Sequence, residues 1–88
     1  MLEQKVRVFG KRLAEMEVAN ENLRYRKPFV IMEKVGEDAW EVRLQASWQD
    51  GTVEKMVINP FANTFQAVTL TRELHEISNL KIVTLEDE

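Results

Sequence analysis

The stretch WEVRLQASWQDGTVEKMVIN, residues 40–59, decides the fold. Over its first nine residues an apolar side chain occupies every second position, a period that is typical of a strand with one buried face. Asp50 and Gly51 follow, and this pair favours a tight hairpin turn. We therefore predict two antiparallel strands, at about residues 39–49 and 52–59, with both tryptophans on the face that forms the core.

A two-residue loop at the hairpin predicts how its two strands pair. Trp48 is then opposite Val53 and Leu44 is opposite Val57, so the valines of the second strand join the tryptophan face. The opposite, outer face of the hairpin is predicted to carry Arg43, Met56 and Ile58. This assignment makes the tryptophan face the more apolar one, which favours its coverage by helices.

Residues 28–35 are rich in β-forming side chains and predict another strand before the hairpin. Its register depends on the turn that follows, because both faces of this strand carry apolar residues. A three-residue turn places Val30 and Met32 on the tryptophan face. A four-residue turn places Phe29, Ile31 and Val35 there, and the number of apolar residues favours this second alternative.

Residues 2–25 predict a helix with an apolar stripe whose members are alternately four and three residues apart. The stripe comprises Leu2, Val6, Phe9, Leu13, Met16, Asn20 and Leu23. A heptad pattern with a polar residue at one seam position is typical of paired helices and favours a homodimer. Further apolar residues beside the stripe, and Gly10 within the helix, favour packing on the protein's own sheet instead. The sequence pattern therefore allows either a homodimer through this helix or packing of the helix on its own sheet.

Residues 64–78 predict a second helix. Asn63 and Gln66 have the spacing of a capping box, and Asn79 is a candidate C-cap. The recurring apolar positions of this helix are Phe65, Val68, Leu74 and Ile77. Several β-branched residues near its start favour a strand over residues 64–70 as the alternative. Residues 80–85 predict a final strand, and residues 86–88 an acidic tail.

These elements predict one α+β domain spanning residues 1–88. Its order is α-β-β-β-α-β, a two-layer sandwich with the helices on one face of a mainly antiparallel sheet. Hydrophobic residues make up 44% of the chain and charged residues 31%, which is typical of a globular protein. The charged residues near the N-terminus leave no segment for a signal peptide or membrane span, so we expect a cytoplasmic protein.

Few residues in the chain are suited to catalysis. The sequence has no cysteine and one histidine. His75 is predicted to lie away from the apolar stripe of its helix and to face solvent. No spacing brings together the nucleophile, base and orienting group of covalent catalysis, or the several ligands of a metal site. We therefore expect neither an enzyme nor a cofactor.

Basic residues are concentrated near the N-terminus, although the net charge of the whole chain is −3. A nucleic-acid surface would comprise Lys5, Lys11, Arg12, Arg24, Tyr25, Arg26 and Lys27, with the tyrosine as a stacking platform. The first five predicted elements also have the order seen in double-stranded RNA-binding domains. Against this, the start of the second helix lacks basic residues, and the acidic remainder of the chain repels a polyanion. Nucleic-acid binding is therefore the alternative function.

Because the residues favour neither catalysis nor a metal site, and favour nucleic-acid binding less, we expect a small protein-interaction, accessory or regulatory domain. It is expected to bind another protein or itself, with a homodimer as the expected state. The candidate contacts belong to the helix stripe, to the outer face of the hairpin and to the end of the sheet. They are Val6, Phe9, Leu13, Met16, Asn20, Arg43, Met56, Ile58 and Trp48.

Overall fold

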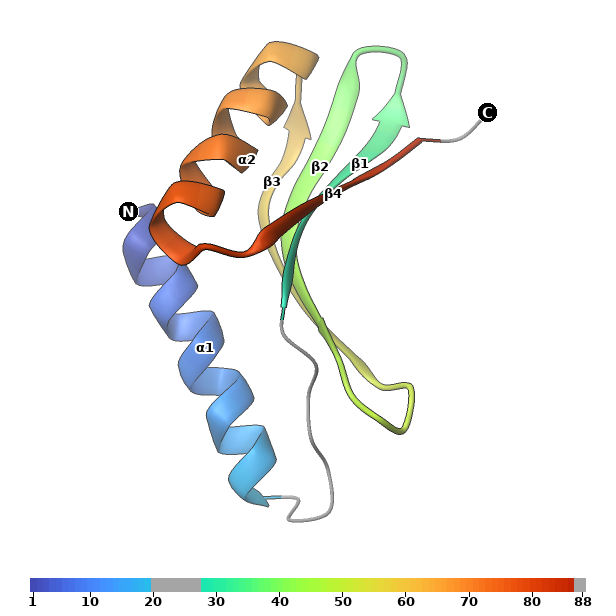
Figure 1. Cartoon of the computed structure of the whole chain (residues 1–88). Helices are drawn as coiled ribbons and strands as arrows, with labels where there is room; N and C mark the ends of the chain where they lie inside the picture. Colours follow the sequence, from blue (N-terminus) through green and yellow to red (C-terminus); the bar gives the residue numbers. More distant parts are fainter. Residues whose placement is uncertain (20–27, 87–88) are drawn as a thin grey trace.

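The computed structural model describes residues 1–19 and 28–86 of the chain. Its elements are α1 (Leu2–Ala19), β1 (Phe29–Gly36), β2 (Ala39–Ser47), β3 (Val53–Ala62), α2 (Thr64–Ser78) and β4 (Lys81–Leu85). Both helices lie on one side of the sheet, as Figure 1 shows. The predicted α+β class and element order are confirmed.

The four strands form one mixed sheet with the spatial order β3-β2-β1-β4. β2 pairs with β1 and with β3 in antiparallel orientation, whereas β4 runs parallel to β1. A parallel neighbour needs a crossover connection, and α2 supplies it between β3 and β4. The edge strands of the sheet are therefore β3 and β4 (Figure 1).

The hairpin between β2 and β3 has a three-residue loop, not the predicted two-residue loop. The amide of Trp48 donates to the carbonyl of Thr52 at 2.8 Å, and the amide of Gly51 donates to the carbonyl of Trp48 at 3.0 Å. Gly51 has a φ of 92°, a left-handed conformation that glycine adopts without strain. A type I turn followed by a left-handed glycine accounts for this loop, and it shifts the pairing by one residue.

This shift exchanges the two faces of β3, because neighbouring residues of a strand point in opposite directions. Leu44 pairs with Met56 and not with Val57. Met56 and Ile58 are partly buried and pack against the core. Val53 and Val57, in contrast, are 42% and 46% exposed on the outer face. The predicted outer-face location of Met56 and Ile58 is therefore wrong.

β1 pairs with β2 in the register of the three-residue turn, whereas the number of apolar residues favoured the register of the four-residue turn. Val30 and Met32 are buried in the core, and Phe29 and Ile31 lie on the outer face. The regular pairing corresponds to the three-residue turn, and an irregularity between Lys34 and Gly36 adjusts the last pairs before the turn. The prediction for Phe29, Ile31 and Val35 is wrong because turn geometry, not the number of apolar residues, sets the register.

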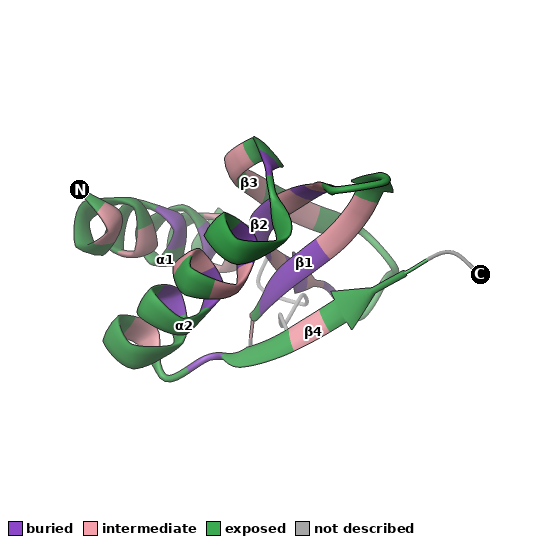
Figure 2. Cartoon of the chain, turned by 90° about the horizontal axis from the view of Figure 1, so that it is seen from above, coloured by how far each residue is buried: buried purple, intermediate pink, exposed green. Residues whose placement is uncertain are grey.

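The core lies between the helices and the tryptophan face of the sheet (Figure 2). α1 contributes Phe9 and Leu13, which are 2% and 0% exposed. Trp40 and Trp48 are 5% and 3% exposed, so the predicted core face of β2 is correct. Large aromatic rings supply much of the burial that an 88-residue chain needs.

α2 begins and ends where the sequence predicts, with both caps formed. The side chain of Asn63 accepts from the Gln66 amide at 2.8 Å, and the Gln66 side chain accepts from the Asn63 amide at 3.1 Å. At the other end Asn79 has a φ of 59° and its amide donates to the His75 carbonyl. The capping box and the left-handed cap explain why helix, not the alternative strand, forms over residues 64–70.

Candidate interaction surfaces

The predicted contact residues of α1 are used within the chain. Phe9 and Leu13 are buried in the core, and Val6 and Met16 are partly buried against it. Phe9 and Leu13 are 2% and 0% exposed, so the folded chain uses both side chains in its core. The remaining member of the predicted interface, Asn20, lies outside the described residues.

Trp48 is also part of the core and is 3% exposed, so the structure places this predicted contact residue with the core residues. α1 lies over this end of the tryptophan face, since Arg12 of α1 bonds to Glu54 of β3 at 3.3 Å. Lys5 and Lys11 are exposed on α1. The other predicted nucleic-acid contacts, Arg24, Tyr25, Arg26 and Lys27, lie outside the described residues.

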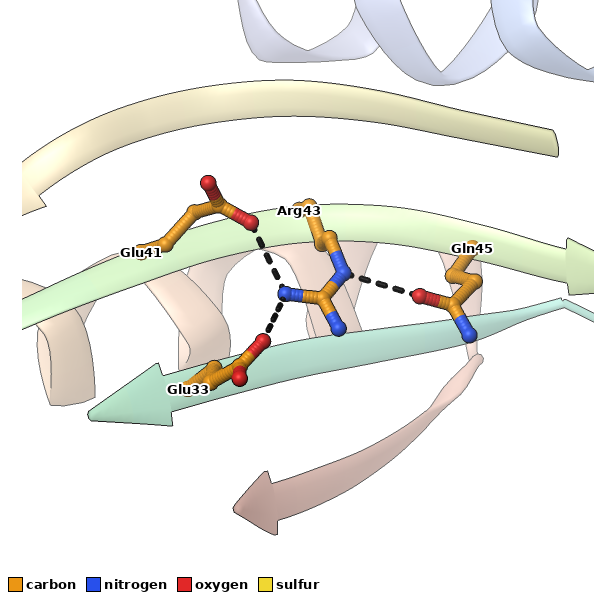
Figure 3. A network of polar contacts seen from close by, with 4 residues as sticks. All are labelled: Glu33, Glu41, Arg43 and Gln45. Carbon is orange, nitrogen blue, oxygen red and sulfur yellow. Dashed lines mark hydrogen bonds and ion pairs between the residues drawn. The ribbon is translucent and has the colours of Figure 1, made fainter. Parts of the chain in front are cut away.

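Arg43 is the predicted contact residue that does lie on the outer face of the sheet, the face opposite the helices. Its Nη1 donates to Glu33 at 2.6 Å and to Glu41 at 2.8 Å, and its Nε donates to Gln45 at 2.8 Å (Figure 3). Glu33 and Glu41 are cross-strand partners. Arg43 therefore separates two like charges that would otherwise face each other across the β1–β2 pair.

The guanidinium of Arg43 stays charged although the residue is only 4% exposed. Burial acts to lower the pKa of Arg43, but the hydrogen bonds and charges of Glu33 and Glu41 outweigh it and raise that pKa. Charge-assisted hydrogen bonds of this kind are among the strong ones in proteins. The network gives the outer face a rigid polar centre.

Apolar side chains surround this centre on the outer face. Arg43 is flanked on one side by Val57 and on the other by Ile31, and Val83 follows in the next strand. Val57 is 46% exposed, while Ile31 is buried at the middle of the row. None of the described helices packs on this face. The apolar side chains that this face exposes lie around the polar network, whose arginine is itself buried.

Two exposed phenylalanines lie where β3 runs into α2, Phe61 on the outer side of the sheet and Phe65 on the side of α2 away from its buried residues. Phe61 and Phe65 are 76% and 79% exposed, although both are large aromatic residues. We call these two residues the phenylalanine patch. The chain carries no charged side chain over residues 56–71, so the sequence around the patch is uncharged.

Local hydrogen bonds hold the backbone of the phenylalanine patch in place. Asp38, in the turn between β1 and β2, accepts from the amide of Thr64 at 2.9 Å and from its hydroxyl at 2.6 Å. The indole of Trp40 donates to the same hydroxyl at 2.9 Å. The Thr64 hydroxyl and amide lower the pKa of Asp38, so this carboxylate stays charged beside the positive end of the α2 dipole.

The prediction that Phe65 lies on the apolar stripe of α2 is wrong. The buried residues of α2 are Ala67, Thr71 and Leu74, whereas Phe65 and Ile77 are exposed. The capping box at Asn63 puts Phe65 in the first helical turn, ahead of the part of α2 that covers the sheet. The uncharged run around the two phenylalanines does not distinguish exposed rings from core residues, because it also contains the buried Ala62 and Ala67.

The described residues contain no group of three or more histidine, cysteine, aspartate or glutamate side chains that could hold a metal ion. Nδ1 of His75 donates to the carbonyl of Leu80 at 2.7 Å and so links the end of α2 to the start of β4. A groove of about 590 Å³ between α1 and α2 is lined by Met1, Leu2, Glu3, Gln4, Arg7, Glu73, Glu76 and Ile77. This lining has no hydroxyl, thiol or imidazole for nucleophilic catalysis.

Neither helix, over the residues that the structure describes, is long and apolar enough to cross a membrane. No protein-family model, no curated protein and no solved structure matches the chain. The function is therefore inferred from the surfaces described above.

Proposed function

We propose that this chain is a non-enzymatic protein-interaction domain and that the phenylalanine patch is a contact surface for its partner. The single observation that carries this proposal is the exposure of Phe61 and Phe65, at 76% and 79%. Both rings lie next to an anchored junction and not on a loose terminus.

The energetics of aromatic side chains support this function. An exposed phenylalanine contributes little to folding, but its burial against a partner is worth about 1.5–3 kcal/mol. Aromatic anchors of this kind are typical of interface hot spots, which cluster on well-packed surfaces. Residues 56–71 carry no charge of their own, and the carboxylate of Asp38 at this junction is already bonded to Thr64, which favours an apolar partner surface.

Site-specific photo-cross-linking in cells of the source organism tests the proposal. Benzoylphenylalanine replaces Phe61 or Phe65 in separate variants, since its ring occupies the same place as the native side chain. We expect each variant to give a discrete cross-linked species on irradiation. Val18 is the matched control position, because it is 80% exposed but lies on α1, away from the patch.

The mass of the cross-linked species distinguishes a second copy of this chain from a different protein. Equal cross-linking from Val18 and from the patch would contradict the proposal, as would no discrete product from Phe61 and Phe65. A product that contains nucleic acid instead of protein would favour the alternative function.

A further inference from the structure

On the outer face of the sheet, rows of side chains lie across the strands, and the charge changes from one row to the next along the strand direction. Its rows follow from the strand register, since cross-strand partners point to the same face. One row consists of Lys55, Gln45, Phe29 and Lys81. The next consists of Val57, Arg43, Ile31 and Val83, and a third contains Glu41, Glu33 and Leu85.

The three rows differ in charge. The first row carries two lysines at the two edges of the sheet, Lys55 on β3 and Lys81 on β4. The middle row is apolar except for Arg43, and because Arg43 and Ile31 at its centre are 4% and 5% exposed, Val57 and Val83 at its ends supply its accessible apolar surface. The third row carries two carboxylates, and each uses one oxygen, Oε1, for Arg43. A positive row, an apolar row and a negative row therefore follow one another on a single face.

We propose that a second copy of this chain docks on this face, with a two-fold axis that runs along the middle row. This inference rests on the proposed interaction function but uses the outer face of the sheet, to which Phe65 of α2 does not belong. Phe61 does point to this face, because its neighbour Ala62 pairs with Trp40 on the core face. Rotation about this axis places the apolar row of each copy on that of the other. It also places the lysine row of each copy over the glutamate row of the other, as a self-complementary two-fold interface requires.

The other way to stack the two faces is with the axis along the strands, and the charges oppose it. That axis places lysines over lysines and glutamates over glutamates, which is repulsive. In the proposed arrangement Lys55 of one copy lies over β3 of the other, one strand from Glu41. Lys81 likewise lies over β4, one strand from Glu33. A lysine side chain spans that distance between neighbouring strands.

The size of the face predicts a weak dimer. Four strands about 4.8 Å apart and three rows about 7 Å apart give roughly 400 Å² per copy, below the usual size of a stable interface and in the range of weak contacts. We therefore expect association to be measurable at about 0.1–1 mM protein, the range of weak complexes.

Molar mass in solution, measured by sedimentation equilibrium, tests this arrangement. Val57→Glu puts a charge into the apolar row and is expected to weaken self-association at least tenfold, with the fold kept because Val57 is 46% exposed. The matched control is Val8→Glu on α1, where Val8 is 51% exposed, and it should leave self-association unchanged. The charge reversal K55E/K81E should also give a monomer, whereas K5E/K11E, with the same change in net charge on α1, should not.

A single cysteine tests the direction of the two-fold axis, because the native chain has no cysteine. Along the proposed axis Val57 of one copy lies over Val57 of the other. Val57→Cys should therefore form a covalent dimer with a short bismaleimide, and Val8→Cys should not. The axis along the strands would place Val57 over Val83 and give no such product.

A wild type that stays monomeric at about 1 mM would overturn the inference, as would a Val57→Glu variant that still dimerises. If Phe65→Ser becomes monomeric while Val57→Glu remains dimeric, the dimer forms through the α2 side of the molecule. That outcome overturns the outer-face dimer and leaves the proposed function intact. If the Phe65 cross-link is absent while the outer-face dimer forms, only the contact role proposed for Phe65 fails.

Discussion

Replacement of Phe9 with glutamate is expected to unfold the protein. Phe9 is 2% exposed and packs in the core beneath α1. Truncation of a buried phenylalanine costs about 3–5 kcal/mol, and a buried unpaired carboxylate adds to that loss. Small domains have total stabilities near the lower end of about 5–15 kcal/mol. Far-UV circular dichroism and urea denaturation should show little or no folded protein.

Val8→Glu is the matched control for this experiment, because the neighbouring side chain is 51% exposed on the same helix. We expect its free energy of unfolding to lie within about 0.5 kcal/mol of wild type. A Phe9→Glu variant that folds as a stable monomer, starting from a dimeric wild type, would show instead that the α1 stripe is an interface between copies.

Replacement of Arg43 with methionine is expected to lower the free energy of unfolding by about 2 kcal/mol. The reason is that Glu33 and Glu41, which are cross-strand partners, lose the cation between them. The expected loss of stability is smaller than for a fully buried ion pair, because both carboxylates are partly exposed and water screens their repulsion. Urea denaturation at low and high salt should show the loss reduced by salt.

Two further variants test whether the Arg43 network contributes more to stability than an ordinary surface ion pair does. Arg12→Met breaks the pair between Arg12 and Glu54, in which the arginine side chain is 43% exposed, and should change stability by about 0.5 kcal/mol or less. The triple variant E33Q/E41Q/R43M removes both carboxylates together with the arginine and should regain most of the stability. No recovery in that variant would contradict the charge-separating role of Arg43.

The elements of the fold were predictable where a local interaction defines them. The Asn63–Gln66 capping box and the left-handed Asn79 set both ends of α2, and the alternation from Trp40 to Trp48 identifies the core face of β2. Strand register was not predictable to the residue. Asp50 and Gly51 suit a two-residue loop, but the chain adopts a three-residue loop with the same glycine left-handed.

The candidate surfaces were harder to predict, because they depend on that register. A slip of one residue moved Val57 from the core to the outer face and Met56 in the opposite direction. Arg43 was assigned to the correct face, but its burial depends on neighbours from three strands. Phe65 has the spacing of a core residue, and only the position of α2 over the sheet shows that its ring lies outside.

We propose that the rings of Phe61 and Phe65 serve a partner and not the fold. The free energy of unfolding of F61S/F65S, measured by urea denaturation beside wild type and Phe9→Ser, tests whether the rings are needed for folding. We predict that F61S/F65S lies within about 1 kcal/mol of wild type, as for substitutions of exposed residues, while Phe9→Ser loses about 3–5 kcal/mol. A loss in F61S/F65S as large as that in Phe9→Ser would contradict the claim, because the rings would then be part of the folded core.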